Sequence, residues 1–188
     1  MKIIGLSGSI VGSKTRTAMD AVAKEIAEKY PEGDFQLIDL KDYDLPFSDG
    51  RNYLDYTGDT AWVTKQIMEA DIIIIGTPVF QASIPASLKN IFDLLPVGAF
   101  QDKIVSFFVT AGSSKHYLVG DHQLKPTLSY MKAQIVQTHV YIEEKSFQQK
   151  QIIDDDVFFR LERLVEDTID TYEASEIIRN KKEDSYGF

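Results

Sequence analysis

Four consecutive isoleucines, Ile72 to Ile75, constrain the fold of this chain more than any other feature of its sequence. Asp71 precedes the run and Gly76 follows it, which makes the segment the clearest candidate for a buried strand. Its β-branched side chains lie on both faces of such a strand, so both faces need cover from other parts of the chain. We therefore expect this strand inside a parallel sheet that has helices on both sides.

Strand and helix patterns alternate along the rest of the chain. Short apolar runs predict further strands over residues 2–6, 35–40, 103–109 and 134–144. Apolar residues at helical spacing predict helices over residues 15–30, 59–70, 85–95, 120–133 and from 154 onward. This alternation, with right-handed connections, predicts an α/β, flavodoxin-like, doubly wound fold. The expected five-stranded parallel sheet has the strand order 2-1-3-4-5, with helices on both faces.

Several local features add to this expectation. Apolar and polar residues alternate over 134–144, which suits an exposed or edge strand. Asp59 is expected to cap the second helix, and Trp62 to lie in the core. The polar segment 41–58 is longer than an ordinary connection, which favours a surface that contacts a partner.

Length and composition bound the class of protein. The 188 residues predict one domain over 1–178 and a charged tail over 179–188 that frays. A net charge of −9 disfavours nucleic acid and anionic membranes as partners. The absence of cysteine excludes disulfides, thiolate catalysis and iron–sulfur clusters, and the three histidines are spaced too widely for a metal site. Without an apolar span or a signal peptide, we expect a cytoplasmic protein.

The segment after the first strand is rich in small and hydrogen-bonding residues. Its candidates for phosphate binding are Ser7, Ser9, Ser13, Thr15, Arg16 and Thr17. A helix start leaves backbone N–H groups unpaired and carries a positive partial charge, so it favours an anion. Both G-x-G-x-x-G and G-x-x-x-x-G-K-[ST] are missing, which argues against a dinucleotide Rossmann site and a nucleoside triphosphatase. The alternative is that these residues form only a polar turn and a helix cap.

Two further loops of this kind follow the strands at 71–76 and 103–109. The candidate binding residues of the first are Pro78, Val79, Phe80, Gln81 and Ser83, and those of the second are Thr110, Ala111, Gly112 and Ser113. In the expected strand order, the carboxyl ends of strands one, three and four are neighbours, so the three loops converge on one crevice. Backbone N–H groups and Phe80 are expected to line a flat ring there.

These residues resemble the NAD(P)H-dependent FMN reductase family of the flavodoxin-like fold. The resemblance rests on Gly8, Ser9, Ser13 and Thr15, on residues 77–80 with Ser83 and Pro85, on 88–89 and 93–96, and on 110–112. Residues 124–129 and 131–134 make the chain most similar to FMN reductases that supply reduced flavin to two-component sulfonate monooxygenases. Phe80 and His122 stand where these relatives commonly have tyrosine.

The resemblance implies hydride transfer from the nicotinamide C4 of NADPH (or NADH) to N5 of FMN. Backbone N–H groups such as those of Gly112 and Ser113 are expected to stabilise the charge that develops near flavin N1 and O2. This chemistry needs no acid–base side chain, so no catalytic residue is named. Lys14 and Arg16 are further candidates for contacts with the phosphates of the nicotinamide nucleotide.

Two alternatives stay open at this point. One is a reductase that retains FMN and passes electrons to quinones, azo dyes or metal oxyanions. The other is a flavodoxin-like electron carrier without a nicotinamide site. The resemblance also implies a homodimer or homotetramer and a flavin-dependent monooxygenase as a possible partner, whereas the choice between NADPH and NADH, the electron acceptor and the role of His122 stay undecided.

Overall fold

The computed structural model describes the backbone of residues 1–186 and the side chains of residues 1–182. The strands of its main sheet are β1 (Lys2–Ser7), β2 (Asp34–Asp39), β3 (Ile72–Pro78), β4 (Ile104–Ala111), β5 (Gln134–Ile135) and β6 (Val140–Glu143). A small hairpin consists of β7 (Phe147–Gln148) and β8 (Gln151–Ile152). The α-helices are α1 (Lys14–Lys29), α2 (Gly58–Glu69), α3 (Ala86–Leu94), α4 (Lys125–Tyr130) and α5 (Asp155–Tyr186). Short helical turns are η1 (Leu40–Asp42), η2 (Tyr53–Asp55), η3 (Ser114–His116), the π-helical η4 (Gly120–Leu124) and η5 (Glu144–Ser146).

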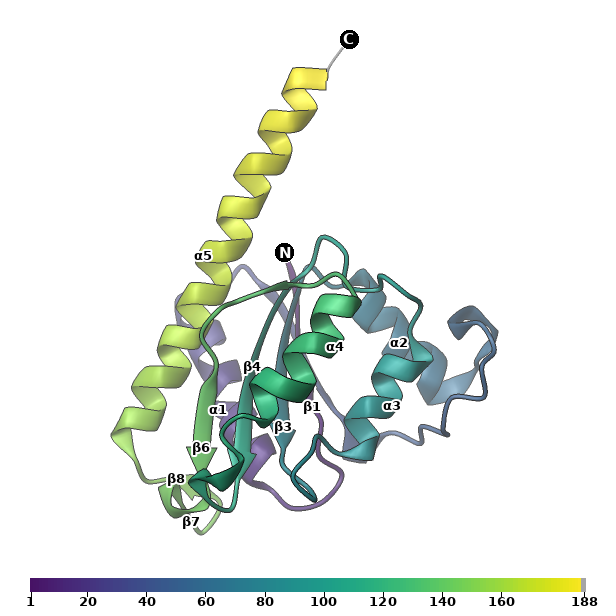
Figure 1. Ribbon diagram of the computed structural model, residues 1–188. Coiled ribbons are helices and arrows are strands. Elements are labelled where there is room, and N and C mark those ends of the chain that lie inside the picture. Colours follow the sequence, from purple (N-terminus) through teal and green to yellow (C-terminus); the bar gives the residue numbers. More distant parts are fainter. Residues whose placement is uncertain (187–188) are drawn as a thin grey trace.

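The main sheet is parallel and has the strand order β2-β1-β3-β4-β5, which confirms the expected flavodoxin-like topology. Ser7 pairs with Gly76, and Gly76 pairs with Phe108, so the carboxyl ends of β1, β3 and β4 are in register. The three loops that follow these strands therefore leave the sheet at the same edge. This edge is at the bottom of Figure 1, next to the β7–β8 hairpin.

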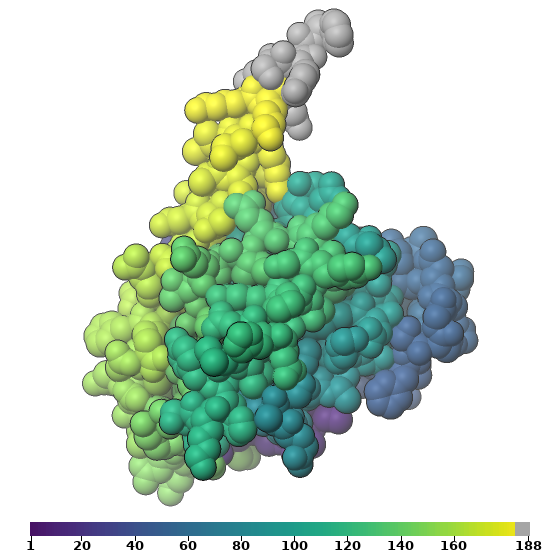
Figure 2. Space-filling model, in the orientation of Figure 1, coloured from purple at the N-terminus to yellow at the C-terminus, as the bar shows by residue number. Residues whose placement is uncertain are grey.

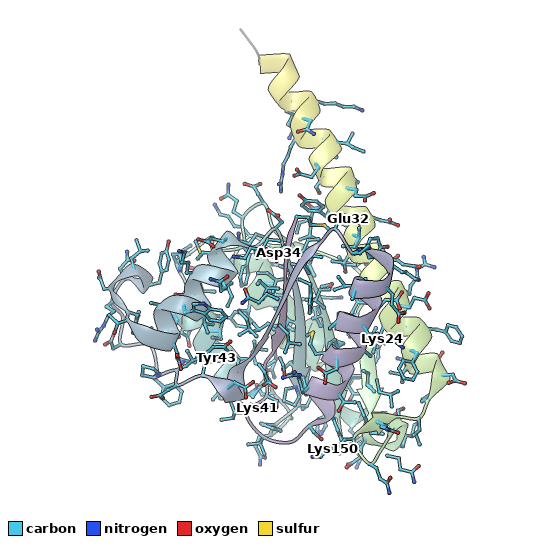
Figure 3. The ribbon with its side chains drawn as sticks, turned by 180° about the vertical axis from the view of Figure 1, so that it is seen from behind. Lys24, Glu32, Asp34, Lys41, Tyr43 and Lys150 are labelled. Carbon is cyan, nitrogen blue, oxygen red and sulfur yellow. The ribbon has the colours of Figure 1, made fainter. Side chains whose placement is uncertain are left out.

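Helices cover both faces of the sheet, as the isoleucine run requires. Ile72 and Ile74 pack toward α1 and α5, whereas Ile73 and Ile75 pack toward α2, α3 and α4. All four isoleucine side chains are fully buried. Figure 1 shows α3 and α4 in front of the sheet, and Figure 3, from behind, shows α1 and α5 on the opposite face.

The predicted strand over 134–144 is interrupted. β5 and β6 both pair with β4, one after the other, and residues 136–139 separate them. The polar residues Gln137 and Thr138 lie at the surface within this interruption. The expected edge position is confirmed for β6, since β4 is its one partner among the described strands. The strand is not exposed, however: Tyr141 is only 8% exposed on the face covered by α2, α3 and α4, and Ile142 is fully buried on the face covered by α1 and α5.

Helix boundaries differ from the expected ones where a local contact decides them. Thr57, rather than Asp59, precedes α2; Asp59 lies in the first turn of the helix, and its carboxylate accepts a hydrogen bond from the backbone N–H of Asp44. The predicted helix over 120–133 consists of the π-helical η4 and the short α4, with Pro126 in the first turn of α4. Pro126 has no N–H to donate to the preceding turn, so a change in helix type at this point is physically reasonable.

Trp62 is not in the core, contrary to expectation. Its side chain is 37% exposed, and its ring stacks on Tyr43 with 5.2 Å between centroids. This contact attaches the segment 41–58 to α2. Asn90 of α3 holds the same segment from the other side, donating to the Pro46 carbonyl and accepting from the N–H of Ser48.

The C-terminal helix continues beyond its expected end. α5 extends to Tyr186 and so includes most of the predicted tail; residues 187 and 188 of that tail lie outside the described residues. Arg179 bonds to Glu176 and donates to the Asp102 carbonyl, which holds this part of the helix to the turn before β4. The upper yellow turns of α5 stand clear of the globular body (Figure 2).

Candidate functional site

A cavity of about 370 Å³ lies at the carboxyl edge of the sheet, where the loops after β1, β3 and β4 meet. Its walls are Val11, Gly12, Ser13, Lys14, Thr15, Pro78, Val79, Phe80, Thr110, Ala111, Gly112 and Glu144. The crevice expected from the strand order is therefore present as one cavity shared by all three loops. Its volume lies within the range of small-molecule sites.

The first wall of the cavity is the start of α1. Ser13 precedes the helix without a capping bond from its own side chain, and the first turn contains no acidic residue. The first backbone N–H groups of an α-helix have no intrahelical acceptor, and the helix dipole is positive at this end. Gly12 reaches this point with φ of +82°, and nothing lies within 4 Å of the position that a Cβ would take. The wall is therefore open and suited to an anion.

The second wall is a tight turn after β3. Phe80 and Ser83 exchange two backbone hydrogen bonds of 2.9 and 3.0 Å, and between them Gln81 and Ala82 have φ of +50° and +57°. The Ser83 hydroxyl donates to Gln123, whose amide donates in turn to the Ala82 carbonyl. The turn therefore fixes the backbone of Phe80 beside the cavity, and the Phe80 ring is 40% exposed there.

The third wall follows β4 and is attached to the other two. The backbone N–H of Val79 donates to the Thr110 carbonyl at 3.0 Å, and the Thr110 hydroxyl lies 2.7 Å from that of Thr15. Beyond Gly112, the Ser113 carbonyl accepts a hydrogen bond from the hydroxyl of Tyr141. These bonds fix the positions of the three loops relative to one another.

Eight of the fifteen predicted site residues line the cavity: Ser13, Thr15, Pro78, Val79, Phe80, Thr110, Ala111 and Gly112. The others do not line it: Ser7, Ser9, Arg16, Thr17, Gln81, Ser83 and Ser113. The Ser9 hydroxyl bonds to the backbone of Val11, and the Thr17 hydroxyl donates to the Lys150 carbonyl. Figure 3 labels Lys150 beside the start of α1.

Ser7 and Arg16 face other surroundings. The Ser7 hydroxyl is fully buried at the end of β1 and has no hydrogen-bond partner within the described part of the chain. Arg16 donates to Asp20 and to Asp39, whose side chain is only 1% exposed. The hydrogen bond to Asp20 raises the pKa of Arg16, and the bond to Asp39 adds to this effect. Arg16 therefore joins α1 to the end of β2 and does not face the cavity.

Sequence reasoning missed three cavity residues: Val11, Gly12 and Glu144. Gly12 belongs to the polar loop that predicts a phosphate site, so the composition of that loop could have identified Gly12 as a site residue. No local signal marks Glu144, which follows β6 and reaches the cavity only through the pairing of β6 with β4. Its carboxylate forms an ion pair with Lys14 on the opposite wall.

Among the described residues, no group of three histidine or acidic side chains could hold a metal ion. None of the described helices is both long enough and apolar enough to cross a membrane.

Fold and cavity together define a class: a flavodoxin-like domain with a nucleotide-sized cavity at the topological switch point of its sheet. Residues 1–147 match the family of NADPH-dependent FMN reductases, and the chain belongs to this family. Members reduce FMN with NAD(P)H, so the chain is an NAD(P)H-dependent flavin oxidoreductase, as the sequence resemblance implied.

Individual relatives agree with this assignment. The chain is 41% identical to an NAD(P)H-dependent FAD/FMN reductase of Geobacillus thermodenitrificans, over 87% of this chain and 89% of the relative. It is 32% identical to the NADH-dependent FMN reductase SfnF of Pseudomonas fluorescens, over 81% of each. Among solved structures, an NADH:FMN oxidoreductase (EMOB) has a TM-score of 0.76 at 24% identity, covering 93% of this chain and 89% of that one. This structural likeness shows the fold.

Proposed function

We propose that the cavity binds FMN, with the phosphate at the start of α1 and the flavin ring between the loops after β3 and β4. The observation that carries this proposal is the joining of an open helix start and a rigid aromatic turn in one cavity. The first feature suits a phosphate and the second a flat ring, and FMN contains both.

The proposed position of the phosphate is supported by the hydrogen-bond donors at the start of α1. The first N–H groups of α1, the Ser13 hydroxyl and the Lys14 ammonium are all donors at the same wall. No acidic residue of α1 lies in its first turn to repel an anion. A phosphomonoester therefore fits this donor set.

The ring half of the proposal rests on shape and backbone. Pro78, Val79 and Phe80 present one wall, and Thr110, Ala111 and Gly112 present the next. Bound FMN supplies the redox chemistry by accepting a hydride from the nicotinamide. The chain's part is to hold the ring in the orientation for reaction and to direct backbone N–H groups of the Thr110–Gly112 wall at its polar edge, where negative charge develops.

The physiological role that we favour is supply of reduced flavin to a flavin-dependent monooxygenase by a cytoplasmic homodimer or homotetramer. The relatives named FMN reductase support release of the flavin as product. An apolar hollow between α3 and α4 supports self-association, since it includes Val97 and Tyr130, which are 75% and 72% exposed. Retention of FMN with transfer to another acceptor is the competing possibility.

One experiment separates these possibilities. Oxidation of NADPH and of NADH is followed in the purified protein before and after FMN is added. A colourless protein whose rate saturates with added FMN supports flavin as a substrate. A yellow protein that stays slow until a quinone or dye is added supports retention. A protein that oxidises neither nucleotide in excess FMN contradicts the proposed activity.

The binding site has its own test. Ser13→Glu places a carboxylate at the start of α1, where it repels a phosphate, so FMN affinity measured by fluorescence titration should fall at least about tenfold. Gln148→Glu on the exposed β7 makes the same change in net charge away from the cavity and should leave the affinity unchanged. Equal FMN affinities for both variants would mean that the phosphate does not bind at this wall.

A further inference from the structure

Lys14 and Glu144 are the two charged residues among those that line the cavity, and they form an ion pair across it. They are 130 positions apart in the sequence. Lys14 begins α1 on one wall, whereas Glu144 follows β6 on the other. Glu144 also lies beside the third loop, since its Oε2 is 3.8 Å from the position that a Cβ on Gly112 would take.

The carboxylate of Glu144 and a ligand phosphate are both anions that the Lys14 ammonium group can bind. The positive end of α1 favours an anion, and the helix has no acidic residue of its own in the first turn. Lys14 contributes the one cationic side chain of the cavity wall. A ligand phosphate at this wall therefore meets a carboxylate that already bonds to Lys14, and the two anions compete for the same ammonium group.

The neighbouring charges leave Lys14 as the partner of Glu144. Lys145, the next residue in the chain, bonds to Glu143 at 3.0 Å. The side chains of Lys14 and Glu144 are 41% and 60% exposed, so water can solvate Glu144 when Lys14 turns to another anion. The exchange of partners is therefore reversible and changes the free energy only modestly.

We propose that Glu144 determines specificity for the flavin by limiting how tightly the cavity holds a flavin phosphate. It does so by competing with the phosphate for Lys14. This inference rests on the proposed function and deepens it, because weaker retention allows reduced FMN to leave the protein. Glu144 acts on the phosphate and not on the ring, so a flavin without a phosphate should not respond to it.

The test uses FMN and riboflavin as probes in fluorescence titrations of four proteins: the unsubstituted chain, Glu144→Gln, Lys14→Gln and the double variant. Glu144→Gln should bind FMN about two- to fivefold more tightly, the range expected for an exposed ion pair. Lys14→Gln should bind FMN more weakly than the unsubstituted chain. In the Lys14→Gln background, Glu144→Gln should have a smaller effect, because the group that both anions seek is gone. The gain should shrink as salt is added.

Glu32→Gln is the matched control, since it removes the same charge from an exposed side chain that does not line the cavity. It should leave both affinities unchanged. Unchanged FMN affinity in Glu144→Gln overturns the inference, and so does an equal gain for riboflavin, which would mean that Glu144 acts on the ring. Absence of FMN binding by the unsubstituted chain overturns the proposed function itself, so the two failures are distinguishable.

Discussion

The hydroxyl oxygens of Thr15 and Thr110 lie 2.7 Å apart, although 95 positions separate them in the sequence. Each side chain is 3% exposed, and the bond joins the first turn of α1 to the end of β4. It therefore fixes the distance between the wall proposed for the phosphate and a wall proposed for the ring.

Replacing Thr110 by valine should destabilise the chain by about 1–2 kcal/mol, because the Thr15 hydroxyl is left buried without this partner. Urea unfolding measures the loss. The double variant Thr15→Val with Thr110→Val should lose less than the sum of the single variants, since it leaves neither hydroxyl unpaired. Strict additivity would show that the bond contributes nothing.

Replacing Arg16 by alanine should affect stability and leave flavin binding intact. The buried carboxylate of Asp39 loses one of its charged partners and keeps Lys41 at 3.0 Å, so we expect a loss of about 1–3 kcal/mol. Arg163→Ala is the control: its side chain is 73% exposed and, among the described residues, pairs only with Asp167, so the change should be within about 0.5 kcal/mol. A large fall in the FMN affinity of Arg16→Ala would mean that Arg16 contributes to FMN binding after all.

His139 should make stability depend on pH below neutrality. Burial lowers its pKa; Asp121 opposes this effect, and Lys125 adds to it. Its ring stacks on Phe107, and Nε2 has no acceptor or donor among the described residues. An unfolded histidine titrates near about pH 6.5, so below this pH the unfolded chain takes up a proton that the folded chain excludes. Stability is therefore greatest above pH 6.5 and falls as the pH drops toward the lowered pKa.

The variant His139→Phe keeps an aromatic ring against Phe107 and removes the titration. Comparing urea midpoints at about pH 5 and about pH 7.5 in both proteins separates this histidine from the carboxylates, which titrate in each. The unsubstituted chain should lose more stability between the two pH values than the variant. The same loss in both proteins would mean that His139 is protonated without penalty.

Replacing Gly76 by alanine should be destabilising by at least about 1–3 kcal/mol. A Cβ at this position would lie 2.4 Å from Phe108 Cζ and 3.0 Å from Thr15 Cγ2, so both neighbours must move. Gly50→Ala is the comparison: nothing lies within 4 Å of its Cβ position, so only backbone strain at its φ of +87° opposes the substitution. Thermal unfolding of both variants ranks the two effects, and an unfolding temperature for Gly76→Ala at or above that of Gly50→Ala would contradict the close packing.

The sequence predicts most of the fold because its signals are local. The isoleucine run and the stripe on α1 define their elements without reference to the rest of the chain. The expected strand order then brings three polar loops together correctly. The exposed position of Trp62 could not be predicted in this way. An apolar ring on a helix is usually a core residue, and only the tertiary structure shows that Trp62 stacks on Tyr43.

The site was less predictable, because side-chain direction depends on tertiary contacts. Arg16 belongs to the right loop but turns to Asp39, which lies at the end of β2. Glu144 lies in the cavity only because β6 pairs with β4. Local sequence patterns do not indicate either contact. They do indicate the three loops, which are rich in small and hydroxylated residues.

The direction of α5 allows the enzyme to be immobilised in a chosen orientation. At 32 residues and about 1.5 Å per residue, the helix is about 48 Å long and runs from the cavity edge of the sheet to the opposite side (Figure 1). The chain contains no cysteine, so Ile178→Cys would create its sole thiol, at a position where the native side chain is 54% exposed. A gold electrode or a resin coupled there would hold each molecule in one orientation, with the cavity facing the bulk solution and open to flavin exchange.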